Sequence, residues 1–158
     1  MFVCHGNICR SPMAEFVFNK MVNDRSLTYI MTAVSSATST EEIGNDIHYG
    51  TKRILDKYGI PYTRREAVQL TYLDYQKYDL FVGMDSANIR NMLRIFGSDP
   101  DNKIIKLLDL TDLGGDVADP WYTGNFEATY RDITKGCEAL IFYLQNKVSS
   151  CKIINNVI

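Results

Sequence analysis

Short runs of apolar residues alternate along this sequence with stripes of apolar residues at helical spacing. The runs at residues 1–3, 29–36, 80–84 and 103–108 predict strands. The stripes and their flanking Ser, Asp, Gly and Pro residues predict helices whose N-terminal caps are Ser11, Asp46, and Asp85 or Ser86, a short helix over residues 72–77 and a long helix that begins at Phe126. Strands that alternate with helices pair in parallel through right-handed crossovers. We therefore expect an α/β fold, a single doubly wound, four-stranded parallel sheet flanked by helices.

The chain has 158 residues, which is the size of one domain. We expect residues 1–158 to form that domain, with residues 148–158 as a poorly packed tail. The formal net charge of −2 does not favour a nucleic-acid partner. The longest apolar stretch, residues 139–144, is far shorter than the ~20 residues that cross a bilayer, so we expect no membrane partner.

Location and cofactors follow from the ends of the chain and its rarer residues. The first residues lack the basic and long apolar segments of a secretory signal, which favours the cytoplasm. Four cysteines are too few for a disulfide scaffold, and two histidines cannot complete a zinc site of ordinary spacing. We expect no metal, no cofactor, and a monomer or a weak dimer.

A loop at residues 4–10 links the first predicted strand to the first helix and carries a cysteine and an arginine at its ends. Such a loop can turn its backbone N–H groups toward one point, where the N-terminus of the following helix adds partial positive charge. The Arg10 guanidinium can grip two phosphate oxygens, and the same field favours the thiolate of Cys4 beneath them. The pattern predicts a phosphate-binding loop, called the P-loop below, formed by His5, Gly6, Asn7, Ile8, Cys9 and Arg10.

The spacing alone allows a second interpretation, in which Cys4 is a buried strand-end cysteine and Arg10 a solvated residue at a helix start. The flanking residues decide between the two. Residues 3–15, VCHGNICRSPMAE, resemble nearly position for position the signature loop of the low-molecular-weight protein tyrosine phosphatases. Residues 35–39, 84–88 and 119–122 are similar to three further segments of that family, in the same order along the chain.

The resemblance implies roles for the polar residues of the P-loop and of the distant Asp-Pro segment. Cys4 would be the nucleophile, Arg10 the phosphate clamp and Asp119 the general acid. Without the resemblance, Asp119 would be interpreted as a turn residue before a proline. Ser11 would form a hydrogen bond to the sulfur of Cys4.

Further residues would support the loop and line the substrate cleft. The resemblance implies that Asn7 holds the loop in its curl, with help from Ser35 and Asn88. Trp121 and Tyr122 are either core aromatics or, because they follow the acid, cleft walls that stack on a phenyl ring.

The chain departs from the family pattern at two places. The family usually has a His-x-Ala-Arg segment where this chain has residues 65–68, so the histidine that braces the loop asparagine is missing. The aromatic residue that usually walls the cleft is replaced near Glu41, with Glu42 beside it. The second departure predicts a cleft that prefers basic residues next to the phosphate.

The resemblance implies that the chain hydrolyses phosphotyrosine in proteins through a phosphocysteine intermediate. Cys4 would attack phosphorus while protonated Asp119 donates to the leaving phenolate, and ionised Asp119 would then activate water. One alternative is a protein-arginine phosphatase on the same scaffold, although such relatives tend to carry Thr where this chain has Ile8. The other is a catalytically weakened phosphate- or phosphotyrosine-binding module, which the missing histidine suggests.

The sequence leaves two interpretations open for each of two P-loop residues, Cys9 and His5. Cys9 could form a reversible disulfide that shields Cys4 from over-oxidation, or be only a small packed residue. His5 could be a base or, as we expect, an exposed loop residue.

Overall fold

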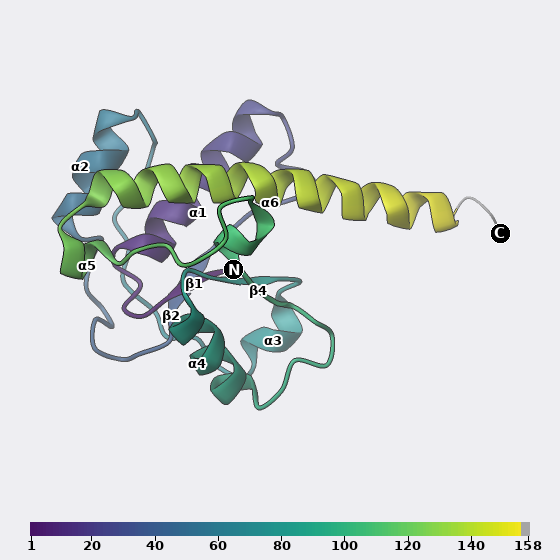
Figure 1. Ribbon diagram of the computed structural model, residues 1–158, viewed down its shortest axis with the longest axis horizontal. Coiled ribbons are helices and arrows are strands. Elements are labelled where there is room, and N and C mark those ends of the chain that lie inside the picture. The colour runs from purple at the N-terminus through teal and green to yellow at the C-terminus, as the bar shows by residue number, and fades with distance from the viewer. Residues whose placement is uncertain (156–158) are drawn as a thin grey trace.

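The computed structural model describes residues 1–155, and within them the side chains of residues 1–147. Its centre is a sheet of four parallel strands in the order β2-β1-β3-β4 (Figure 1), so the predicted fold class is confirmed. The strands are short: β1 is Phe2–Cys4, β2 is Ser35–Ala37, β3 is Phe81–Gly83 and β4 is Ile104–Lys106. The chain begins in the middle of the sheet, moves out to β2 and then crosses to β3 and β4, which is a doubly wound order.

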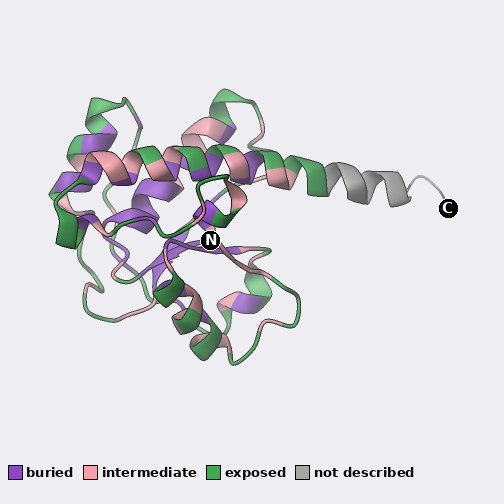
Figure 2. Ribbon diagram, in the orientation of Figure 1, coloured by how far each residue is buried: buried purple, intermediate pink, exposed green. Residues whose placement is uncertain are grey.

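Helices cover both faces of the sheet. They are α1 Arg10–Asp24, α2 Tyr49–Lys57, α3 Asp74–Lys77, α4 Ser86–Phe96, α5 Pro120–Thr123 and α6 Phe126–Asn155, with a 3₁₀ turn at Leu107–Leu110. Because side chains alternate along a strand, Phe2 and Cys4 join the core under α1 and α6, whereas Val3 packs with Phe81 and Met92 on the side of α3 and α4. Figure 2 shows the buried residues gathered along the strands and the inner faces of the long helices.

The second strand is shorter than the sequence predicts. Only Ser35–Ala37 pairs with β1, whereas the backbone of residues 28–30 forms a turn and Tyr29 is 80% exposed. Aromatic and β-branched residues favour a strand mainly where their side chains can pack against neighbouring strands. The run at residues 29–34 lacks that packing, so its composition alone was a misleading signal.

The first helix begins one residue before the predicted cap. Its N-cap is Cys9, which makes no side-chain cap bond, and Arg10 is the first helical residue. The hydroxyl of Ser11 lies instead 3.0 Å from the sulfur of Cys4. Ser11 is therefore part of the loop's internal hydrogen bonding and does not act as a helix cap.

The cap predicted for the second helix is also wrong. α2 begins at Tyr49, and Nδ1 of His48 accepts from the backbone amide of Gly50 at 3.1 Å. Asp46 accepts instead from Lys52 at 2.7 Å, which holds the loop before the helix. Either residue type can satisfy a polar group at a helix start, so the sequence did not separate them.

The C-terminal helix extends past the sheet (Figure 1). The expectation of a poorly packed tail over residues 148–158 falls on side chains outside the described set. Within the part of the chain that the structure describes, no helix is both long and apolar enough to cross a membrane.

Candidate active site

The P-loop wraps around the sulfur of Cys4 at the carboxyl end of β1. The backbone amide of Asn7 donates to Cys4 Sγ at 3.3 Å, and Ser11 Oγ lies 3.0 Å from the same atom. Asn7 has a φ of 58°, a left-handed conformation that a non-glycine residue adopts only at a cost. The sulfur therefore lies on the floor of a strained loop, as the sequence predicts.

Arg10 is buried beside this loop and faces two carboxylates. Its Nη1 donates to Asp85 Oδ2 at 2.6 Å and to the carbonyl of Val117 at 3.1 Å, and its Nη2 donates to Asp119 Oδ2 at 2.5 Å. Burial acts to lower the pKa of Arg10, but Cys4 and the two carboxylates outweigh it and hold that pKa above its ordinary value. The guanidinium is a permanent cation at the loop.

The third nitrogen of this guanidinium has no partner. Among the described residues, Arg10 Nε is buried and makes no hydrogen bond. Because a buried unpaired N–H is costly, such a donor points to a function that supplies an acceptor. An oxygen of a bound anion is an acceptor of the right kind.

Asp119 reaches the loop from the far end of the chain. It caps α5, accepting from the amide of Trp121 at 3.0 Å, and the preceding segment is anchored where the amide of Val117 donates to the carbonyl of Met84 at 2.8 Å. This backbone bond ties the loop after β4 to the end of β3. The carboxyl ends of the parallel strands thus bring Cys4 and Asp119 to one edge of the sheet.

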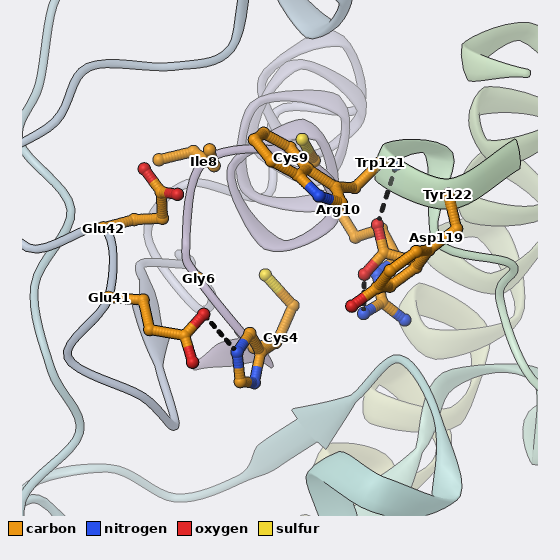
Figure 3. A pocket seen from close by; sticks show the side chains of 11 residues that line it. Cys4, Gly6, Ile8, Cys9, Arg10, Glu41, Glu42, Asp119, Trp121 and Tyr122 are labelled. Atoms are coloured by element: carbon orange, nitrogen blue, oxygen red, sulfur yellow. Dashed lines mark hydrogen bonds and ion pairs between the residues drawn. The ribbon is translucent and has the colours of Figure 1, made fainter. Parts of the chain in front are cut away.

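Cys4 and Asp119 line the same cavity, which has a volume of about 100 Å³. Glu41 and Glu42 lie on one side of Cys4, and Trp121 and Tyr122 follow Asp119 on the other (Figure 3). The complete lining is Cys4, His5, Gly6, Ile8, Cys9, Arg10, Glu41, Glu42, Asp119, Trp121 and Tyr122. All the predicted cleft residues and all the predicted P-loop residues except Asn7 face this cavity.

The two predicted aromatic walls are exposed rather than part of the core. Trp121 is 57% and Tyr122 83% exposed, so both side chains are accessible to a ligand. On the opposite rim, His5 Nε2 and Glu41 Oε2 form an exposed hydrogen bond at 3.0 Å. The cavity therefore has an aromatic wall and an acidic wall.

Cys9 has a different environment from Cys4. It is 5% exposed, and burial first, then the neighbouring Cys4, raises the pKa of its thiol to about 12. Cys9 is therefore a protonated packed thiol at neutral pH. Its predicted disulfide with Cys4 stays a prediction, because both cysteines are free in the structure.

The expected support of Asn7 is only partly correct. Ser35 Oγ accepts from Asn7 Nδ2 at 2.8 Å, as predicted. Among the described residues, Asn88 makes no hydrogen bond to Asn7. Its side-chain Oδ1 accepts from the backbone amide of Met84 at 3.1 Å, and its backbone amide donates to Asp85 Oδ1 at 2.7 Å. Asn88 thus contacts Asp85, the partner of Arg10, from the first turn of α4.

Two site residues escaped the sequence analysis. Asp85 fixes Arg10, and its position directly after a strand end was a usable signal. Arg65 Nη2 donates to Asn7 Oδ1 at 2.9 Å, in the segment where the bracing histidine is missing. The only signal for this arginine was its place in the segment aligned with the missing histidine, because the contact itself spans 58 positions.

The sequence and the fold both match known proteins closely. The model of the family described as low molecular weight phosphotyrosine protein phosphatase matches residues 1–150. The low molecular weight protein-tyrosine-phosphatase YfkJ of Bacillus subtilis is 39% identical over 150 residues, which are 93% of this chain and 96% of YfkJ. The protein of the same kind named PtpA from Staphylococcus aureus is 35% identical over 144 residues, 90% of this chain and 91% of PtpA.

Two crystal structures show the same architecture. That of YfkJ from Bacillus subtilis aligns with a TM-score of 0.89 at 38% identity, covering 92% of this chain and 93% of the other. That of SP-PTP, a low molecular weight protein tyrosine phosphatase from Streptococcus pyogenes, aligns with a TM-score of 0.81 at 42% identity and covers 90% of both chains.

Proposed function

The chain belongs to the family of low molecular weight phosphotyrosine protein phosphatases, and we propose that Cys4, Arg10 and Asp119 perform the hydrolysis of phosphotyrosine in it. The observation that carries this proposal is the cavity in which all three side chains meet. A nucleophile, a cation and a proton donor around one small cavity are the parts that cleavage of a phosphate monoester needs.

Substrate binding uses the P-loop and Arg10. The phosphoryl oxygens accept from the P-loop amides and from Arg10, including the unpaired Nε. They also compete with Asp119 for Nη2, whose bond to that carboxylate is 2.5 Å long. The arriving dianion thereby frees the carboxyl group, and repulsion between the two negative charges favours its protonated form.

The first chemical step transfers the phosphoryl group to sulfur. The Cys4 thiolate attacks phosphorus and forms the S–P bond while the P–O bond to the tyrosine oxygen breaks. Protonated Asp119 gives its proton to that oxygen, which is needed because a phenol with a pKa near 10 is a poor leaving group. Arg10 and the amides of the P-loop stabilise the charge on the equatorial oxygens.

The second step returns the enzyme to its starting state. Ionised Asp119 takes a proton from water, the water oxygen attacks phosphorus, and the S–P bond breaks. Inorganic phosphate leaves, Cys4 is a thiolate again and Asp119 is protonated for the next turnover.

Family membership makes phosphoproteins the substrates. We extend this to substrates in which the aromatic ring lies against Trp121 and Tyr122 while basic neighbours face Glu41, and to a monomeric or weakly dimeric cytoplasmic enzyme. Charge supports the specificity, since Glu41 and Glu42 line the rim opposite the aromatic wall. The comparisons favour neither an arginine phosphatase nor a binding module.

The decisive experiment combines two variants with several substrates. We expect Cys4→Ser to bind phosphate without turnover, and wild-type activity to be greatest on phosphotyrosine peptides with basic flanks, with much less on phosphoserine and phosphoarginine. Asp119→Asn should slow phenyl phosphate by about 10²–10⁴-fold and 4-nitrophenyl phosphate far less, since the latter leaves without a proton.

Asp116→Asn is the matched control for the acid. Asp116 lies on the same loop but pairs with Lys106 at 3.0 Å and does not line the cavity. Equal slowing of both esters by Asp119→Asn would remove Asp119 as the proton donor. Turnover by Cys4→Ser near the wild-type rate would remove Cys4 as the nucleophile.

A further inference from the structure

The side-chain amide of Asn7 uses all of its hydrogen-bonding positions. Its Oδ1 accepts from Arg65 Nη2 at 2.9 Å and from the amide of Val68 at 3.1 Å. Its Nδ2 donates to Ser11 Oγ at 2.9 Å and to Ser35 Oγ at 2.8 Å. Because the two groups facing Oδ1 can only donate, the orientation of this amide is fixed.

Arg65 is anchored from three sides where it meets Asn7. It donates from Nη1 to Ser35 Oγ at 2.7 Å and from Nη2 to the Ser35 carbonyl at 3.1 Å. Nη1 also forms an ion pair with Glu15 on α1, and the two side chains are only 17% and 16% exposed. The hydroxyl of Ser35 donates in turn to Glu15 Oε2 at 2.7 Å, which completes the network.

The fixed amide dictates the direction of the next hydrogen bond. Since Ser11 Oγ already accepts from Asn7 Nδ2, its own proton is free to point elsewhere. The two acceptors within reach are Cys4 Sγ at 3.0 Å and the Ser36 carbonyl at 3.4 Å. Cys4 Sγ is the closer of the two acceptors, and in the proposed mechanism it is the charged nucleophile, so the hydroxyl donates to the sulfur.

We propose that Arg65, held by Glu15, is a positioning residue that acts together with the Val68 amide to fix the donor direction of the chain from Asn7 through Ser11 to Cys4, so that Ser11 donates to the nucleophile. The proposal rests on Cys4 being that nucleophile. A guanidinium has no acceptor atom and stays charged at any pH at which the enzyme folds, so the direction does not reverse. This chain thus has an arginine that holds Asn7 Oδ1 in the segment where the bracing histidine is missing.

A purely structural role for Arg65 makes a different prediction. In that case Arg65 only ties its loop to β2. Its loss then lowers the stability of the protein but leaves the pH midpoint of Cys4 alkylation in the folded protein unchanged. A directional role changes the thiolate itself, and does so through Ser11.

The test measures the rate of Cys4 alkylation by iodoacetamide against pH, with the modified cysteine identified by mass spectrometry. Arg65→Met keeps the aliphatic stem and removes every donor. We expect the pH midpoint of alkylation to rise by about one unit and kcat on a phosphotyrosine peptide to fall about tenfold. Arg64→Met, at the exposed neighbouring arginine, should change neither.

The same measurement in a Ser11→Ala background tests the route. We expect Arg65→Met to add little there, because the hydroxyl it directs is absent. An unchanged midpoint in the single variant, or a full further shift in the double variant, overturns the proposal. If Arg65→Met does not fold, Arg65→Lys serves instead, since its single nitrogen cannot replace both guanidinium nitrogens, and the midpoint should again rise. If Cys4→Ser loses turnover but Arg65→Met leaves the pH midpoint of Cys4 alkylation unchanged, this inference is refuted and the proposed function stays intact.

Discussion

Asp85 shows how one side chain serves two parts of the site. Its Oδ1 accepts from the amide of Asn88 at 2.7 Å and so caps α4, while its Oδ2 accepts from Arg10 at 2.6 Å. The first contact stabilises a helix, and the second orients Arg10, the proposed phosphate clamp. The two roles can be separated because only the second needs a negative charge.

We expect Asp85→Asn to impair catalysis and spare stability. Asparagine caps helices as well as aspartate does, so the melting temperature should stay close to that of the wild type. Loss of the charged hydrogen bond to Arg10, worth about 1.5–3 kcal/mol, should lower kcat/KM by about ten- to a hundredfold. Steady-state kinetics and thermal unfolding measure the two effects, and Asp85→Ala should reduce both quantities. Unchanged kcat/KM in Asp85→Asn would contradict this role.

At the scale of elements, α6 must approach the 3₁₀ turn at Leu107–Leu110 very closely. A Cβ atom on Gly136 would lie 2.4 Å from Cγ of Leu107, a fully buried side chain. The helix thus tolerates a residue of low helix propensity because nothing larger fits there.

We therefore expect Gly136→Ala to destabilise the protein, although the same change in an exposed helix stabilises it by about 1 kcal/mol. The added methyl group must displace Leu107, and overpacking of this kind costs about 1–3 kcal/mol. Urea unfolding measures the difference, with Lys135→Ala at the exposed neighbouring position as control. A more stable Gly136→Ala variant would show that the helix can shift away.

At the scale of the whole molecule, His48 joins the start of α2 to α6 and to α5, the short helix that follows Asp119. Its ring stacks on Phe126 at 5.2 Å with a 3° angle and meets Trp121 edge-on at 5.7 Å. Burial lowers the pKa of His48 below its ordinary value. The folded protein thus holds a neutral imidazole among aromatic rings.

This environment makes stability depend on pH. Below about pH 6.5 the unfolded chain protonates His48 before the folded chain does, so stability should fall as the pH drops from 7.5 to 5.5. His48→Asn, which keeps a capping side chain, should show a shallower fall in melting temperature. His5→Asn, at the exposed histidine of the rim, is the control.

The α-amino group of Met1 acts in the same direction, because burial lowers its pKa to about 5. It is present in wild type and variants alike, so their difference isolates His48. Parallel curves for the wild type and His48→Asn would contradict the prediction.

The sequence alone determined the sheet and its helical cover, and it singled out Cys4, Arg10 and Asp119 as candidate catalytic residues. Strand runs and helical stripes are local periodicities, and the spacing of Cys4 and Arg10 is local as well, so each could be interpreted without a fold. The matching segments at residues 3–15 and 119–122 then pointed to Asp119. The predicted start of the second strand was wrong because it was inferred from residue composition and not from packing. Tyr29, where that strand was predicted to begin, is 80% exposed.

Only the tertiary structure decided which charges meet. Arg65 reaches Asn7 across 58 positions and Asp85 reaches Arg10 across 75, because crossovers bring separate loops to the same edge of the sheet. The partner of a buried charge depends on which loop lies next to it in the fold, and the periodicity of the sequence does not predict which loop that is. The proposed chemical residues thus lie in sequence segments that can be recognised one by one, whereas the residues that hold them in place are defined by the fold.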